Sequence, residues 1–160
     1  MLNSKILPYL LLIVGGSLVS AQTPASVTGT LTIAGKTFKL SHVSAQERKD
    51  PFDDTKKRIR VVLSDVAVSD TVMRDDDTYY DLINGDKLHA IEFWFTADGE
   101  SSGGEIMHDM TSHQFIQPLV TFDKKVFDST TVSGKVSTKS GKGDAFSYKC
   151  TATFTAPVER

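Results

Sequence analysis

Hydrophobic residues recur at every second position along most of this chain, which is the spacing of strands with one buried face. The clearest alternation spans residues 146–155, where Ser, Lys and Thr residues separate the apolar ones. The side chains predicted to face inward there are Phe146, Tyr148, Cys150, Ala152 and Phe154. Residues 132–138 alternate in the same way, and the glycines of the loop 139–144 permit a reversal between the two segments. We therefore predict a C-terminal hairpin of an antiparallel sheet.

Other segments have the alternation or the β-branched and aromatic composition of strands. They are residues 27–33, 37–40, 59–68, 88–96, 106–111, 113–120 and 121–127. The segment 59–68 is apolar on both faces at Val61-Val62-Leu63, as in a central strand that is covered on both sides. Two stretches between strands are predicted to be loops: the polar residues 44–57 around Pro51, and residues 101–104.

Residues 75–85 depart from the strand pattern. Acids stand at positions 75–77, where a helix N-terminus favours them, and Asn84-Gly85 suits a helix end. No sequence repeat and no linker divides the rest of the chain. We predict a single all-β domain over residues 22–160. It would be an antiparallel β-sandwich of about eight or nine strands, with at most one short helix near residues 77–84.

Residues 1–21 have the organisation of a secretory signal peptide. A positive start at Lys5 precedes an apolar run from residue 6 to about residue 19, and Val19-Ser20-Ala21 supplies small residues for cleavage. The run is shorter than the ~20 residues that span a bilayer. We expect cleavage before Gln22, no membrane insertion after cleavage, and a periplasmic or secreted protein.

The charge balance argues against a nucleic-acid partner. Without Lys5, which leaves with residues 1–21, the chain keeps 17 basic and 20 acidic residues. Basic clusters at Arg48-Lys49 and Lys56-Lys57-Arg58 are flanked by acids, so their fields largely cancel beyond about 8–10 Å. These clusters are predicted to be solvated loops. The expected partner lies in the cell envelope or outside the cell.

Cys150 is the single cysteine, so an exported domain must be held by packing and hydrogen bonds, without an internal disulfide. Its inward position predicts a small buried hydrophobe, in preference to a reactive thiol. No Asn-x-Ser/Thr acceptor follows residue 21. Together these features favour a bacterial periplasm over a eukaryotic secretory route.

Several short phrases are shared with other sequences. The run from Gly29 to Ala45, Gly-Thr-Leu-Thr-Ile-Ala-Gly-Lys-Thr-Phe-Lys-Leu-Ser-His-Val-Ser-Ala, is followed by Val61-Val-Leu-Ser-Asp65. The chain closes with Val132-Ser-Gly-Lys-Val136 and Phe154-Thr-Ala-Pro157. In these phrases it resembles uncharacterised exported bacterial proteins over most of its mature length. The resemblance implies a shared scaffold and no named activity.

The four histidines, His42, His89, His108 and His113, lack the spacing of a zinc site. The nearest approach is His108-Asp109-x-x-x-His113. In a strand, positions 108 and 113 face opposite sides, which separates the two imidazoles. A partly buried, hydrogen-bonded His108 is the simpler expectation.

Acids are densest around Asp75-Asp76-Asp77, where several carboxylates could supply calcium ligands. The spacing of a calcium-binding loop is absent, and helix capping explains the same acids. Both interpretations stay open. The candidate metal ligands are Asp75, Asp77, Asp81, His108 and His113, and no cofactor is predicted.

No motif for nucleophilic catalysis is present, so no catalytic residue is assigned. A carboxylate pair for glycoside hydrolysis can be recognised only in the folded chain.

Trp94 is the most informative aromatic residue. If Phe93 and Phe95 face the core, then Glu92 and Trp94 face the other way. Trp94 would either cover a second layer or mark a possible contact surface.

These features favour a non-catalytic binding or scaffolding module that is exported by a bacterium. One alternative is a small hydrolase-type enzyme whose Asp and His residues meet only in the fold. A second alternative is a calcium-stabilised module around residues 75–86.

Overall fold

The computed structural model describes residues 23–50, 53–115, 119–139, 141–142 and 146–160, so the predicted signal segment lies outside it. The strands are β1 (Ser26–Ile33), β2 (Lys36–Leu40), β3 (His42–Lys49), β4 (Lys57–Ser64), β5 (Ala90–Thr96), β6 (Ser101–His108), β7 (Thr111–Phe115), β8 (Val120–Phe127), β9 (Thr131–Thr138), β10 (Gly141–Lys142) and β11 (Ser147–Glu159). The helices are α1 (Asp70–Arg74) and α2 (Asp76–Asn84).

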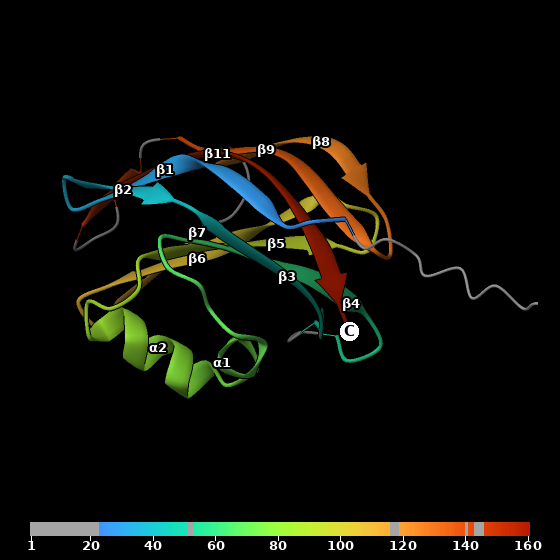
Figure 1. Ribbon diagram of the computed structural model, residues 1–160, viewed down its shortest axis with the longest axis horizontal. Coiled ribbons are helices and arrows are strands. Elements are labelled where there is room, and N and C mark those ends of the chain that lie inside the picture. Colours follow the sequence, from blue (N-terminus) through green and yellow to red (C-terminus); the bar gives the residue numbers. More distant parts are fainter. Residues whose placement is uncertain (1–22, 51–52, 116–118, 140, 143–145) are drawn as a thin grey trace, which may run out of the picture.

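The strands form two stacked layers, which confirms the predicted all-β class (Figure 1). The first sheet has the order β2-β1-β11-β9-β8, and β10 pairs with the start of β11. The second sheet is the meander β3-β4-β5-β6-β7. All these pairings are antiparallel. The end of β11 adds one parallel pairing, Val158 opposite Ala45, which joins the two sheets.

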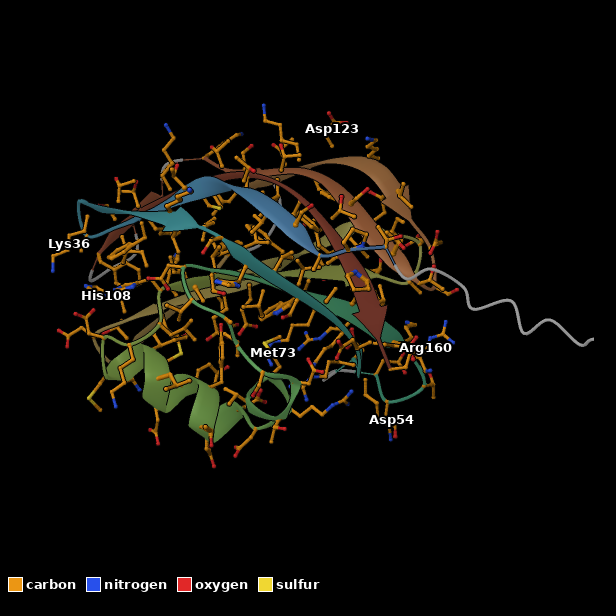
Figure 2. The ribbon with its side chains drawn as sticks, in the orientation of Figure 1. Lys36, Asp54, Met73, His108, Asp123 and Arg160 are labelled. Atoms are coloured by element: carbon orange, nitrogen blue, oxygen red, sulfur yellow. The ribbon has the colours of Figure 1, made fainter. Side chains whose placement is uncertain are left out.

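Alternating side chains from both sheets fill the space between the layers (Figure 2). The inward residues of β11 are the predicted ones, and Cys150 among them has no exposed surface. Burial raises the pKa of the Cys150 thiol to about 12, so the thiol stays protonated and acts as a small hydrophobe. The prediction of a buried cysteine is confirmed.

A second apolar cluster lies on the outer face of the second sheet, beneath the two helices. Val62 of β4 packs there with Met73 of α1, and with Tyr79 and Ile83 of α2. Figure 2 shows Met73 between the helices and the sheet. The apolar run Val61-Val62-Leu63 therefore belongs to a strand that is covered on both faces, as its sequence predicted.

Helix α2 matches the predicted helix, and its N-cap is one of the predicted acids. The Asp75 carboxylate accepts hydrogen bonds from the backbone N–H and the hydroxyl of Thr78, which hold the pKa of Asp75 below its usual value. The chain also contains α1, a five-residue helix that the sequence did not predict. Ser69 caps α1. Met73 is the single buried residue of this helix, and one buried position does not produce the helical spacing of apolar residues that a sequence analysis detects. Neither described helix is long and apolar enough to cross a membrane.

The predictions that residues 44–57 and 101–104 are loops are wrong, because both segments contain parts of strands. Within residues 44–57 the structure has most of β3 and the start of β4. Polar residues dominate this part of the sequence because alternate side chains of β3 face the outer surface of the sheet, where Gln46 is nevertheless buried. Residues 101–104 begin β6, and Gly104 is required there because the Phe115 ring occupies the place of a side chain.

Gly104→Ala tests this packing of β6 against β7. An added Cβ would lie about 2.6 Å from the Phe115 ring and would also strike the Glu92 carbonyl. We expect a loss of about 3 kcal/mol in the free energy of unfolding, measured by urea denaturation with circular dichroism. Gly85→Ala is the control, since Gly85 is exposed with a φ of −82° and its added Cβ would meet only the Asp81 carbonyl, at 3.1 Å, so it should lose about 1 kcal/mol or less. Equal losses in the two variants would contradict the close packing.

Candidate functional site

The helices cover only part of the outer face of the second sheet, and a pocket of about 850 Å³ lies beside the start of α2. Its cationic lining residues are Arg48, Lys49, Arg58 and Arg60. Its acidic lining residues are Asp50, Asp76, Glu92 and Glu105. The remaining lining residues are Tyr80, Trp94, Ser102 and Gln114. The pocket therefore combines charges of both signs with two aromatic rings.

Strand alternation explains why these side chains meet. On β5, Phe93 and Phe95 enter the core between the sheets, which turns Glu92 and Trp94 to the outer face. The predicted orientation of Trp94 is confirmed, because it lines the pocket on the side away from the sandwich core. Cross-strand pairing then places Glu105 of β6 directly opposite Glu92.

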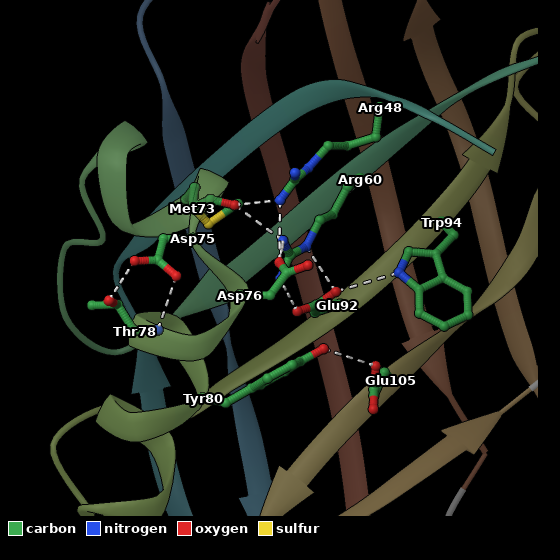
Figure 3. Close-up of polar contacts among 10 residues, drawn as sticks. All are labelled: Arg48, Arg60, Met73, Asp75, Asp76, Thr78, Tyr80, Glu92, Trp94 and Glu105. Carbon is green, nitrogen blue, oxygen red and sulfur yellow. Dashed lines mark hydrogen bonds and ion pairs between the residues drawn. The ribbon is translucent and has the colours of Figure 1, made fainter. Parts of the chain in front are cut away.

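A buried ion pair between Arg60 and Glu92 forms the centre of the site (Figure 3). Their side chains are only 5% and 6% exposed. Arg60 Nε donates to Glu92 Oε2 at 2.8 Å, and Arg60 Nη2 donates to Glu92 Oε1, so the pair is bidentate. Trp94 Nε1 also donates to Glu92 Oε2, at 3.3 Å. These bonds fix the Glu92 carboxylate and the Trp94 indole relative to each other.

The same arginine ties the sheet to the helices. Arg60 Nη1 donates to the Met73 carbonyl at 3.1 Å and to Asp76 Oδ1 at 2.9 Å. Its guanidinium carbon lies 4.8 Å from the centre of the Tyr79 ring. Burial opposes the positive charge, but the adjacent Glu92 carboxylate outweighs this effect and holds the pKa of Arg60 above its usual value. Arg60 therefore stays charged and holds the start of α2 against β4.

Among the described residues, the second carboxylate, Glu105, is held only by hydroxyl groups. Ser112 Oγ donates to Glu105 Oε1, and the Tyr80 hydroxyl lies 3.5 Å from Glu105 Oε2. Burial, together with the negative charge of Glu105, raises the pKa of the Tyr80 hydroxyl, which keeps it protonated as a donor. No cationic side chain of the described residues forms an ion pair with Glu105. Its charge is thus compensated less well than that of Glu92.

Cationic groups gather at the other end of the pocket. Arg48 and Arg58 are direct cross-strand neighbours on β3 and β4. Arg48 Nη2 donates to the Met73 carbonyl at 2.6 Å and to Asp76 Oδ1 at 3.2 Å. Asp76 is therefore shared between Arg48 and Arg60. The Arg58 guanidinium lies 4.6 Å from the centre of the Trp94 ring, and its buried Nε has no hydrogen-bond partner among the residues that the structure describes.

These contacts correct the prediction that both basic clusters are solvated loops. Arg48 and Arg58 belong to strands and line the pocket. Sequence reasoning also missed Arg60, Glu92 and Glu105 as site residues. The available signal was a charged residue within an otherwise apolar strand, as at Arg60 among Ile59, Val61 and Val62.

The structure does not gather the candidate metal ligands. Asp75 caps α2, while Asp77 and Asp81 are exposed on the same helix. His108 contacts the Phe146 ring and His113 contacts the Tyr148 ring, with ring centres 5.4 and 5.1 Å apart. Within the described ranges, no three or more His, Cys, Asp or Glu side chains are placed to hold a metal ion.

One histidine does lie between two carboxylates. His89 Nδ1 is 2.7 Å from Asp65, and its Nε2 is 3.0 Å from Asp86. The His89 ring stacks on Phe38, with ring centres 3.6 Å apart. None of these residues lines the pocket, and no described histidine does. The Asp and His residues of the hydrolase hypothesis are therefore not brought together in the pocket.

The Arg60–Glu92 pair can be tested by a double-mutant cycle. Arg60→Met leaves the buried Glu92 carboxylate without an ionic partner and should lose about 3 kcal/mol in the free energy of unfolding. Glu92→Met should lose less, because Arg60 still pairs with Asp76. The double variant leaves neither charge, so it should lose much less than the sum, with a coupling energy of about 2–3 kcal/mol in urea denaturation. The exposed pair Lys57–Glu47 is the control, with an expected coupling below about 1 kcal/mol. Additive losses at Arg60 and Glu92 would contradict a structural ion pair.

Comparisons of the chain with protein-family models, with curated proteins and with solved structures find no significant match. Any function must therefore be argued from the geometry of the pocket.

Proposed function

We propose that this protein is an exported bacterial binding module, and that the pocket beside α2 holds a small polar molecule without converting it. The observation that carries the proposal is the set of charged and aromatic side chains that the Arg60–Glu92 pair fixes around the pocket. A volume of about 850 Å³ falls within the range of ligand pockets. Side chains that are already ordered lose little conformational entropy on binding.

The way Glu92 is held favours binding over catalysis. Both oxygens of its carboxylate accept hydrogen bonds from Arg60, and one also accepts a bond from Trp94. A carboxylate with these partners is poorly suited to accept a proton or to attack a substrate, because either step would break the buried ion pair. Its clear role is to orient its neighbours.

One observation favours a second candidate, a glycoside hydrolase. Glu92 and Glu105 are opposite each other on neighbouring strands and both line the pocket, and two carboxylates flank the bond that such enzymes cleave. Release of reducing sugar from a polysaccharide panel, abolished by Glu105→Gln, would favour the enzyme. Turnover that this variant does not change would come from a contaminant.

Trp94 provides a direct readout of binding, because it is the single tryptophan of the chain and lines the pocket. We expect its fluorescence to change in a saturable way with at least one member of a panel of amino acids, short peptides, neutral sugars and acidic sugars. Ser102→Phe should weaken that binding at least tenfold, because the added ring enters the pocket. Ser147→Phe, on an exposed position of β11, is the control and should bind normally. If no member of the panel changes the fluorescence or the melting temperature, the proposed function is wrong.

Export supplies a separate prediction, supported by the sequence of residues 1–21. In a bacterial host, the mature protein should be found in the periplasm or medium with Gln22 as its first residue, as determined by mass spectrometry. Replacing the apolar run 9–14 with a segment containing two Arg residues should retain the longer chain in the cytoplasm. Accumulation of the unprocessed wild-type chain in the cytoplasm would rule out export.

A further inference from the structure

Three cationic side chains and the carboxylate of Glu105 lie at different ends of the pocket, which restricts the ligand that it can accept. We define the cationic end as Arg48, Lys49 and Arg58, and the carboxylate end as Glu105 with its cross-strand neighbour Gln114. Asp50 and Asp76 also lie at the cationic end. Trp94 lies between the two ends, on the strand between β4 and β6. The buried charges of Arg60 and Glu92 neutralise each other, so this pair adds no net charge for a ligand to match.

At the cationic end a positive charge lacks a close partner. Arg48 and Arg58 oppose each other directly across two strands, a placement that costs free energy for like charges. Arg48 shares Asp76 with Arg60, while Arg58 forms no ion pair with the described acids. Burial lowers the pKa of Arg58, and Asp50 and Glu92 oppose that effect through longer-range attraction. An anionic group beside Arg58 would offset the repulsion between Arg48 and Arg58, and it would accept a hydrogen bond from Arg58 Nε.

At the carboxylate end, Glu105 lacks a cationic partner among the described residues. Glu105 is buried, faces Glu92 across the strands, and receives hydrogen bonds only from hydroxyl groups among its described partners. A carboxylate offers about four acceptor sites, so bonding capacity remains. The Tyr80 ring beside Glu105 adds a surface that attracts cations. An ammonium group is the complementary ligand for this end.

The spacing of the ends sets the length of the ligand. Arg58 pairs with Thr96, four residues from Glu92, and Glu92 pairs with Glu105. The backbone positions of Arg58 and Glu105 are therefore about 13 Å apart along the strands and about 10 Å apart across them. The Arg58 side chain extends over Trp94, which shortens the distance that a ligand must span. From this backbone separation we expect an α-amino acid, with both charges on one carbon, to be too short to reach both ends.

We propose that the ligand is a zwitterion whose ammonium and carboxylate are separated by a spacer, as in a short peptide with free termini or an ω-amino acid. This proposal rests on the proposed binding function. The ammonium contacts Glu105 and Tyr80, the spacer lies along Trp94, and the carboxylate contacts Arg58 and Arg48. The four cationic and four acidic lining residues balance, which matches a ligand without net charge.

The test measures Trp94 fluorescence and heat of binding for Ala-Ala, Ala-Ala-Ala and 6-aminohexanoate with the purified protein. Binding of the peptides alone or of 6-aminohexanoate alone identifies which source of the zwitterion is recognised. Acetylation of the peptide amine, or amidation of its carboxylate, should weaken binding at least tenfold. Hexanoate and hexylamine should each bind at least tenfold more weakly than 6-aminohexanoate, as should glycine.

Variants assign each end of the ligand. Glu105→Gln should weaken binding of the zwitterion at least tenfold and leave hexanoate binding unchanged, while Arg58→Gln should weaken the zwitterion and leave hexylamine unchanged. Lys149→Gln, exposed on β11, is the matched charge-removal control. Circular dichroism and melting show whether each variant is folded; if Arg58→Gln unfolds, Arg58→Lys is used and should weaken the zwitterion at least threefold.

The outcomes separate this proposal from the proposed function. Saturable binding of a neutral or acidic sugar, with no effect of Glu105→Gln or Arg58→Gln, would overturn the zwitterion while leaving a binding pocket. Equal binding of blocked and free peptides would also overturn it. No response of Trp94 or of the melting temperature to any probe would overturn both.

Discussion

One buried arginine determines how the outer layer of this protein is arranged. Arg60 lies on the face of β4 that points away from the sandwich core, where a charge without partners would be very unfavourable. It is compensated by Glu92 from the next strand, by the carbonyl at the end of α1 and by Asp76 at the start of α2. Together with the apolar cluster of Val62, Met73 and Tyr79, these contacts hold both helices on the sheet beside the open area.

The strand pattern was predictable where one face of a strand is apolar and the other is polar. This holds for β11, β9 and β1, whose outer face is rich in Thr and Lys. It fails for β3, because Gln46 is buried on the face beneath the helices although its side chain is polar. A single sequence does not show that a polar residue on the outer face of a strand will be buried in the folded chain.

The site was harder to predict because its parts are distant in the sequence. Alternation alone was enough to turn Trp94 outward, and this prediction is confirmed. The pairing of Arg60 with Glu92 spans 32 residues, and the pairing of Glu92 with Glu105 requires the register of β5 with β6. The acids at the start of α2 and the histidines of residues 108–113 are close in sequence, which made them candidate metal ligands. In the structure Asp75 caps α2, His108 contacts the Phe146 ring, and His89 pairs with Asp65.

The parallel contact between the end of β11 and β3 has a consequence for how the chain assembles. Strand β11 is the central strand of the first sheet, between β1 and β9, and it also supplies the bond to the second sheet. Strands that are remote in sequence can pair only after the intervening chain has been made. The first sheet therefore cannot complete its order β2-β1-β11-β9-β8 until β11 has been synthesised, whereas the meander β3-β4-β5-β6-β7 has no pairing that needs β11 apart from the parallel contact at β3.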